Sequence, residues 1–305
     1  MNYNNFIVVF GAYIMFLLSS CGNSNAVDNN DKTTADDKDT LALKIAVMPT
    51  LDCLPFFIAK EQGIFEKEGL KVSLKMFNAQ MDCDTALTSG SVDGAFTDLI
   101  RIEHLNKKGL VGLVARTSTC ASWQLLSNKN ANITTLAQLE DKMIASTRFS
   151  ATHMLADMIM NEAGYADDKT FLVQINDVNI RLMMLRNNEM DAAMLPEPYA
   201  TLARMDNHKV LKDSRQMGLQ LGALAFRNSK DTIKSQNINK LLVIYEQICD
   251  KIDESGFTSY RKLISEYCNI KESLVDSIPL DIKFSVKPNV LSDNQAKAKS
   301  WYNDN

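Results

Sequence analysis

Two nine-residue stretches decide the fold: residues 87–95 read Leu-Thr-Ser-Gly-Ser-Val-Asp-Gly-Ala, and residues 185–193 read Leu-Arg-Asn-Asn-Glu-Met-Asp-Ala-Ala. A leucine, an aspartate and the last alanine coincide at an offset of 98 residues. The same offset lays residues 142–145, Lys-Met-Ile-Ala, on residues 44–47, Lys-Ile-Ala-Val. Two matches in one register indicate that a single α/β unit occurs twice along the chain.

Strands and helices alternate in the first of these units. Strands are predicted at 43–48, 70–77 and 95–97, and helices at 55–62, at 82–87 and from the third strand to residue 107. This order predicts right-handed βαβ units and a mainly parallel sheet flanked by helices. A later strand at 219–226 can cross back to the first unit, and amphipathic helices over 229–268 are interpreted as scaffold.

Two similar α/β units predict one shared binding site. Residues 41–305 exceed the usual size of a domain with one core, so two lobes are expected. Ligands of open α/β sheets lie beyond the carboxyl ends of the strands, where helices begin. Facing lobes therefore predict a cleft between them.

The N-terminus is typical of an exported lipoprotein. The apolar run at 6–18 is too short to span a bilayer but suits a signal peptide. Residues 18–22, Leu-Ser-Ser-Cys-Gly, resemble a lipobox in which Cys21 is lipidated, although residues 1–5 lack the usual lysine or arginine. We expect a signal peptide at 1–20; the alternative is a plain secretory peptide with an incidental cysteine.

Composition restricts the classes of function. Residues 21–40 are polar and cannot bury enough apolar surface to order themselves, so a disordered tether is expected there. The net charge is −4 and no basic face is evident, so nucleic-acid binding is not expected.

The opening of the first unit carries a family resemblance. Residues 45–47, Ile-Ala-Val, and residues 55–72, Pro-Phe-Phe-Ile-Ala-Lys-Glu-Gln-Gly-Ile-Phe-Glu-Lys-Glu-Gly-Leu-Lys-Val, resemble the start of ABC-importer substrate-binding proteins of the nitrate/sulfonate/taurine and thiamine-precursor branch. Residues 86–93 resemble a second signature of that family, and residues 191–199, which contain Pro-Glu-Pro-Tyr, a third. The resemblance implies an α/β, type II periplasmic-binding-protein fold whose two lobes close on a solute by a hinge.

The same resemblance implies the lobe boundaries. Lobe one would comprise 41–116 plus 218–305, and lobe two 117–217. Family members often carry glycine or serine in the loop after the second strand, whereas here residues 78–83 read Asn-Ala-Gln-Met-Asp-Cys. Residues 51–53 likewise end in an Asp-Cys pair. This departure leaves the class of ligand open.

Loops at the predicted strand ends supply the candidate cleft residues. Three loops come from lobe one, three from lobe two, and one crossover lies between them. The candidates are Thr50, Asp52, Cys53, Gln80, Asp82, Thr97, Asp98, Trp123, Arg148, Phe149, Ser150, His153, Asp177, Glu197 and Tyr199.

Several of these candidates allow two interpretations. Residues 146–153 open a helix whose free N–H groups, with Arg148, can hold an anionic group; alternatively, Ser150 caps the helix and Arg148 points into water. Glu197 beside Tyr199 suits an amine or a heterocycle. Trp123 can stack on a ligand or belong to the core.

The cysteines suggest disulfides, because export leads to an oxidising space. We expect Cys53 to pair with Cys83 near the cleft and Cys249 with Cys268, which leaves Cys120 unpaired. Free thiols are the alternative, and so is a metal site built with Asp52, Asp82 and Asp98, although no histidine is near them in sequence.

An enzyme is not expected. The three histidines are dispersed, and no nucleophile, phosphate-loop or dinucleotide motif occurs. The same fold hosts enzymes such as a thiamine-pyrimidine synthase, but its cysteine-rich run and active-site histidine have no recognisable counterpart here.

We therefore expect the solute-binding component of an ABC-type importer. It would capture a small polar organic ligand in the interlobe cleft and deliver it to a membrane permease and its ATPase. We expect a monomer without cofactors, held at the cell envelope by its lipid anchor and facing the periplasm. The alternatives are a metal-binding or sensory lipoprotein that uses the Asp-Cys loops, or an enzyme of the synthase type.

Overall fold

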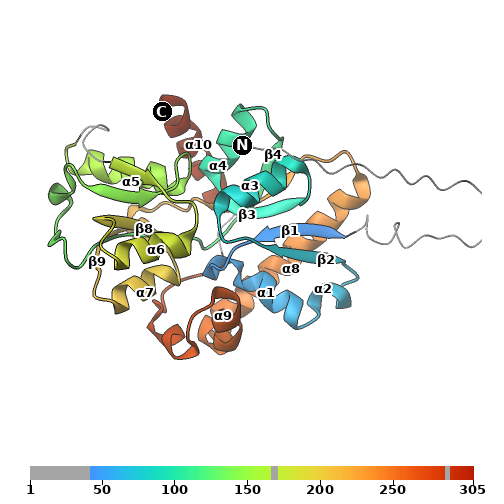
Figure 1. Cartoon of the computed structure of the whole chain (residues 1–305). Helices are drawn as coiled ribbons and strands as arrows, with labels where there is room; N and C mark the ends of the chain where they lie inside the picture. The colour runs from blue at the N-terminus through green and yellow to red at the C-terminus, as the bar shows by residue number, and fades with distance from the viewer. Residues whose placement is uncertain (1–41, 166–170, 286–288) are drawn as a thin grey trace, which may run out of the picture.

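Two five-stranded sheets organise the protein in a computed structural model that describes residues 42–165, 171–285 and 289–305 (Figure 1). The predicted signal peptide, the tether and Cys21 lie outside the described residues. In the part of the chain that the structure describes, no helix combines the length and the apolar character needed to cross a membrane.

The first sheet has the strand order β2-β1-β3-β10-β4. Its strands are β1 (Leu43–Val47), β2 (Val72–Met76), β3 (Gly94–Asp98), β4 (Leu113–Ser118) and β10 (Gly222–Arg227). Its helices are α1 (Leu54–Glu61), α2 (Ile64–Lys67), α3 (Gln80–Ser89), α4 (Leu99–Lys107), α8 (Thr232–Ser255) and α9 (Arg261–Cys268). Apolar residues of α1, α8 and α9 form one core with this sheet, and those of α3 and α4 contribute to another. We call this part lobe one.

The second sheet has the equivalent order β7-β6-β8-β5-β9. Its strands are β5 (Trp123–Ser127), β6 (Met143–Ser146), β7 (Phe171–Gln174), β8 (Ala192–Pro196) and β9 (Lys209–Asp213). The accompanying helices are α5 (Ala151–Glu162), α6 (Val178–Arg186) and α7 (Tyr199–Met205). We call this part lobe two.

The repeat in the sequence is a repeat in the structure, with a correction of one residue. β3 and β8 begin 98 residues apart, at Gly94 and Ala192. However, Ile45 pairs with Gly94, whereas Ile144 pairs with Ala192, so the first strands match at an offset of 99 and the predicted register of 98 is wrong there. The stretch from the first to the third strand of the repeat is therefore one residue longer in lobe one than in lobe two.

Both sheets are mainly parallel, as predicted, but each contains one antiparallel strand, β10 in lobe one and β5 in lobe two. β1 is parallel to β2 and β3, and β6 is parallel to β7 and β8. β10 is antiparallel to β3 and β4, and β5 is antiparallel to β8 and β9. β5 and β10 follow the two connections between the lobes, so each enters its sheet against the direction of its neighbours. The predicted strand that crosses back to lobe one is confirmed as β10.

The C-terminal helix α10 (Asn289–Asp304) contacts both lobes (Figure 1). It packs on α4 and β4 of lobe one. Trp301 Nε1 donates a hydrogen bond of 3.0 Å to Asp157 Oδ2 on α5 of lobe two. The helix therefore links the two lobes in addition to the crossover strands.

Candidate functional site

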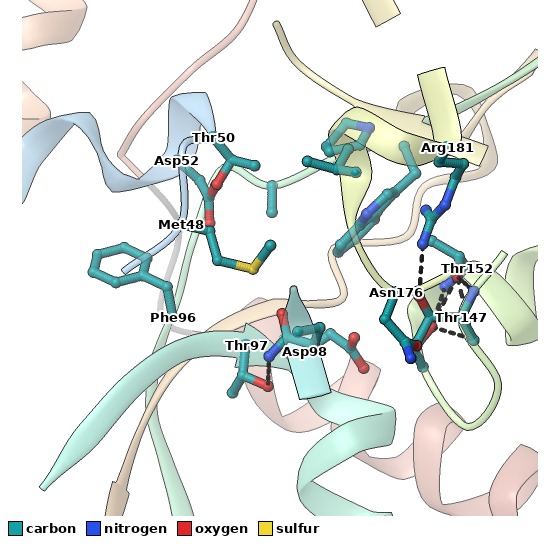
Figure 2. A pocket seen from close by; sticks show the side chains of 16 residues that line it. Met48, Thr50, Asp52, Phe96, Thr97, Asp98, Thr147, Thr152, Asn176 and Arg181 are labelled. Carbon is teal, nitrogen blue, oxygen red and sulfur yellow. Dashed lines mark hydrogen bonds between the residues drawn. The ribbon is translucent and has the colours of Figure 1, made fainter. Parts of the chain in front are cut away.

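A cleft lies between the lobes where β1, β3, β6 and β8 end (Figure 2). Its cavity volume is about 70 Å³ in this conformation, and the cavity opens to solvent. The lining residues are Met48, Thr50, Asp52, Gln80, Phe96, Thr97, Asp98, Ala121, Trp123, Thr147, Ser150, Thr152, Asn176, Val178, Arg181 and Pro196. Both sets of strand ends contribute, as expected for a site at the carboxyl edge of α/β sheets.

Lobe one contributes two buried carboxylates. Asp52 follows β1 in a short 3₁₀ turn, and its Oδ2 accepts a hydrogen bond of 3.2 Å from Thr119 Oγ1 on the crossover. Asp98 is the last residue of β3 and caps α4, because Oδ1 accepts from Arg101 N at 2.9 Å. Burial raises the pKa of both carboxyl groups, that of Asp98 to about 7.

Lobe two contributes a guanidinium that is bound internally. Arg181 Nη1 donates to Met194 O at 2.6 Å, and Nη2 donates to Thr147 Oγ1 at 2.6 Å (Figure 2). Ile175 O accepts from both Nε and Nη2. Burial lowers the pKa of Arg181 to about 10. The guanidinium thus orders the loops after β6, β7 and β8 and has few donors left for a ligand.

The start of α5 is also occupied by the protein's own groups. Ser150 Oγ accepts from Thr152 N at 3.1 Å, which is helix capping rather than anion binding. The Asp98 carboxylate of lobe one faces Ala151 N–H, which favours its ionised form. Thr152 Oγ1 accepts from Thr147 N at 2.8 Å. Of the two interpretations of residues 146–153, the structure therefore favours capping.

The lobes touch at several points around the cleft. Asp98 of lobe one lies next to Ala151, the first residue of α5 in lobe two. The side chain of Arg101, on the helix that Asp98 caps, forms a buried ion pair with Asp84. The further contacts are Leu51 N donating to Glu197 O at 3.0 Å, Arg101 Nη1 donating to Arg148 O at 3.1 Å, and an isolated antiparallel bridge between Ala79 and Asp177. The structure is therefore a conformation in which the lobes meet.

Seven of the fifteen predicted ligand-binding residues line the cleft: Thr50, Asp52, Gln80, Thr97, Asp98, Trp123 and Ser150. The other eight do not line it: Cys53, Asp82, Arg148, Phe149, His153, Asp177, Glu197 and Tyr199. The seven lie at or near the ends of strands and the starts of helices, whereas most of the eight make contacts elsewhere in the protein.

Arg148, Phe149 and His153 line a different hollow, beside α10 and α5. The ring of Phe149 stacks on that of His104, with 4.6 Å between the centroids. Phe149 has a φ of 51°, which turns this part of the loop away from the helix axis. Sequence spacing alone could not reveal this left-handed turn.

Glu197, Tyr199 and Asp177 have structural roles. Glu197 is buried and accepts from Arg204 Nη1 at 2.9 Å and from Thr201 Oγ1 at 2.6 Å. Tyr199 is buried in the core of lobe two, and burial raises the pKa of its hydroxyl. Asp177 caps α6 through Asn179 N at 2.8 Å. The predicted amine site at Glu197 is therefore filled by the protein itself.

The predicted disulfides are not formed: the five described cysteines are free and buried. Cys53 and Cys83 belong to different cores of lobe one, so they cannot approach each other. Cys249 and Cys268 share a core but remain thiols. Burial raises the pKa of these thiols, to about 12 for Cys83 and Cys249.

The metal alternative gains no support. Among the residues that the structure describes, no group of three or more His, Cys, Asp and Glu side chains could hold a metal ion. Asp82 is exposed on the first turn of α3, outside the lining that includes Asp52 and Asp98. The two Asp-Cys loops therefore do not bring their side chains together at one site.

Nine lining residues were not named individually as candidates. Ala121, Thr147, Thr152 and Val178 lie in loops that were expected to line the cleft, whereas Met48, Phe96, Asn176, Arg181 and Pro196 lie outside those loops. Met48 and Pro196 lie at or just after strand ends, so a wider window around each strand end would have included them. Arg181 lies within α6, and nothing in its local pattern indicated that it turns back under the cleft.

Comparisons with known proteins agree with this geometry. The NMT1/THI5 like family matches residues 50–235, more than half of the chain. A protein of Brachyspira hyodysenteriae named as an ABC transporter periplasmic binding protein is 23% identical over 273 residues, which cover 83% of this chain and 75% of that protein.

Solved structures show the same fold. The alkanesulfonate-binding protein SsuA from Xanthomonas axonopodis pv. citri, bound to MOPS, superposes with a TM-score of 0.74 at 18% identity and covers 86% of this chain and 93% of its own. The nitrate-binding protein NrtA from Synechocystis PCC 6803 gives 0.67 at 15% identity, with 77% and 68% covered. The chain has the two-lobed periplasmic-binding-protein fold, and it belongs to the NMT1/THI5 like family.

Proposed function

We propose that this protein is the solute-binding component of an ABC-type importer, which captures a small polar organic ligand in the interlobe cleft. The observation that carries the proposal is the cleft itself. It lies at the ends of four strands from two lobes, with apolar walls from Met48, Phe96 and Trp123 and hydroxyl groups from the threonines around them. Family membership and the names of the similar proteins support this interpretation.

The lining favours binding over catalysis. None of the sixteen lining side chains is a histidine, a cysteine or a lysine, the groups that most often act as nucleophile or general base. Several hydroxyls of the lining are held by the protein's own groups: Ser150 caps α5, Thr147 accepts from Arg181, and Thr97 accepts from Gln80. We infer that the protein is not an enzyme.

Closure is the proposed mechanism. Residues 41–116 plus 218–305 would form one rigid lobe and residues 117–217 the other, and ligand contacts on both lobes would favour the closed state. The closed surface would then dock on a membrane permease with its ATPase. Hydrogen bonds such as Leu51 N to Glu197 O are of the kind that form only when the lobes meet.

We also propose that Cys21 is lipidated after removal of residues 1–20, so that a monomer is held at the cell envelope and faces the periplasm. The test is cell fractionation of the expressed full chain and of Cys21→Ser. We expect the parent in the membrane fraction and the variant in the soluble fraction of the envelope. An unchanged distribution would contradict lipidation at Cys21.

The binding function is tested by native mass spectrometry of the exported protein. We expect a non-covalent increment of a few hundred daltons that disappears on denaturation, and the increment gives the mass of the solute. A screen of small metabolites follows if the protein is purified empty. Failure of every solute to bind would contradict the proposal.

Fluorescence localises the binding event, because the chain has only two tryptophans. Trp301→Phe leaves Trp123, which lines the cleft, as the single tryptophan. The solute should change the emission of this variant. Trp123→Phe leaves Trp301, which lies outside the cleft lining but bonds Asp157 of lobe two, so its emission reports lobe closure and not contact with the solute.

A further inference from the structure

The charges that line the cleft are mainly negative. Of the sixteen lining side chains, Asp52, Asp98 and Arg181 are the charged ones. Asp52 and Asp98 are 8% and 4% exposed, so the solvent screens them little. Arg181 donates four hydrogen bonds to groups of lobe two. The carboxylates of lobe one are therefore the charges that a ligand meets.

Asp98 occupies the place at the start of α5 that an anion would take. Anions bind helix N-termini through free main-chain N–H groups. Here Thr152 N–H donates to Ser150 Oγ at 3.1 Å and His153 N–H donates to Ser150 O at 3.0 Å. Asp98 faces the remaining N–H, that of Ala151, closely enough for this group to favour the ionised carboxylate. A second negative group would lack these donors and would also be repelled by Asp98 at short range.

The same groups suit a positively charged solute. An ammonium or amidinium group makes charge-assisted hydrogen bonds with carboxylates, which are stronger than those between neutral groups. The ring of Trp123 lines the same space and favours a cation beside it. The ring of Phe96 is turned into the core of lobe one, where it packs edge-on against Phe56 and Tyr245. Met48 and Val178 add apolar surface for a flat organic body. Burial raises the pKa of Asp98, and a bound cation would stabilise its ionised form.

We propose that this cleft selects a small organic cation, an ammonium or amidinium group on a flat apolar body, and rejects oxyanions, with Asp98 as the residue that sets the preference. The inference rests on the binding function proposed above and adds the charge class of the solute. It separates this chain from the proteins named for sulfonate and nitrate binding, with which it shares the fold.

The test compares probes of one size and opposite charge on the full chain. Isothermal titration calorimetry at pH 8 would use benzylammonium and benzamidinium against benzoate and benzenesulfonate. We expect measurable binding of at least one cation, and binding of both anions weaker by about tenfold or more. A solute that co-purifies, identified by its mass, should be cationic at neutral pH.

Variants identify the groups responsible. Asp98→Asn and Asp52→Asn should each weaken cation binding about tenfold, because each removes one charge-assisted hydrogen bond. Asp141→Asn is the matched control, since Asp141 is exposed and has a φ of 57° that asparagine tolerates. Thermal unfolding of each variant shows whether the fold is retained, and the comparison of probes on the parent protein requires no variant.

The outcomes separate the two proposals. Binding of anions in preference to cations, or an anionic co-purified solute, overturns the charge assignment and leaves the binding function intact. Equal loss of cation affinity in Asp141→Asn overturns the role of Asp98. If no probe of either charge binds and no solute is captured, both the charge assignment and the binding function are overturned.

Discussion

Lobe one and lobe two place the same carboxylate at the same point of the framework. Asp93 Oδ2 accepts from Lys44 N at 2.8 Å, and Asp191 Oδ2 accepts from Met143 N at 2.9 Å, so each aspartate holds the start of the first strand of its repeat, β1 or β6. The ends of the strands differ. Lobe one places Asp52 and Asp98 in the cleft lining. Lobe two places hydroxyl groups there, and its Arg181 is hydrogen-bonded to groups of the same lobe. The difference indicates that both lobes keep the same hydrogen bonds at the strand starts, whereas the side chains at the cleft-facing strand ends differ and determine the specificity for the ligand.

The largest effect is expected from removing the internal guanidinium of lobe two. Arg181→Met should lower the free energy of unfolding by about 3 kcal/mol, because Met194 O and Ile175 O lose buried donors. Arg186→Met on the same helix is the control. It removes a partly exposed ion pair with Asp206 and should cost less than about 1 kcal/mol. Urea titration measures both, and equal losses would contradict an internal role for Arg181.

The repeated aspartates test whether the frameworks are equivalent. Asp93→Ala and Asp191→Ala should each destabilise the protein by about 1–2 kcal/mol through the unpaired strand N–H. Asp93 has an additional ion pair with Lys234, at 2.7 Å, so its loss should be slightly larger. Chemical denaturation gives the two values. If the two losses in unfolding free energy differ by several kcal/mol, the two lobes share a backbone arrangement in which the equivalent aspartates do not contribute equally to stability.

The carboxylate of lobe one should also produce a pH dependence. The pKa of Asp98 is raised from 3.8 to about 7, so the folded state holds a proton that the unfolded state has lost between about pH 4 and pH 7. Stability therefore falls as pH rises through this window, by about 1 kcal/mol per pH unit at most. Asp98→Asn should remove that slope.

The measurement is the difference between parent and variant in denaturant titrations from pH 5 to pH 8. Asp52, Asp84 and Arg101 lie near Asp98 but are common to both proteins, so the difference isolates Asp98. A difference that does not change with pH would contradict the raised pKa.

The smallest expected change is in the reactivity of the thiols. All five described cysteines lie in cores to which lobe one contributes, and burial raises their pKa values. Labelling with a disulfide reagent at pH 8 should therefore be at least about a hundredfold slower in the native state than in denaturant, since the thiolate is the reacting form. Fast native labelling would place one of them at the surface.

Much of the fold could be predicted because it depends on local patterns. The strand and helix positions of the first unit, the crossing strand and the family resemblance all follow from periodicity and from a few short motifs. The one antiparallel strand in each sheet could not be predicted, because strand direction in β5 and β10 depends on how the chain passes between the lobes.

The site was predicted less well, for a different reason. Residues at or near strand ends, such as Asp52 and Asp98, were found because their place follows from topology. Arg181 was missed and Glu197 was assigned to the ligand, because the use of a charged side chain depends on its partners in space. The predicted disulfides were wrong, because adjacent strands place Cys53 and Cys83 in different cores.

The hydrogen bond between Leu51 N and Glu197 O has a consequence for transport. It joins the lobes through main-chain groups alone, and one hydrogen bond that contributes about 1 kcal/mol shifts an open–closed equilibrium about fivefold. An empty protein that spends part of its time closed competes with the loaded one for the permease. A solute then needs less intrinsic affinity to close the cleft, but the empty protein also docks on the permease without delivering anything.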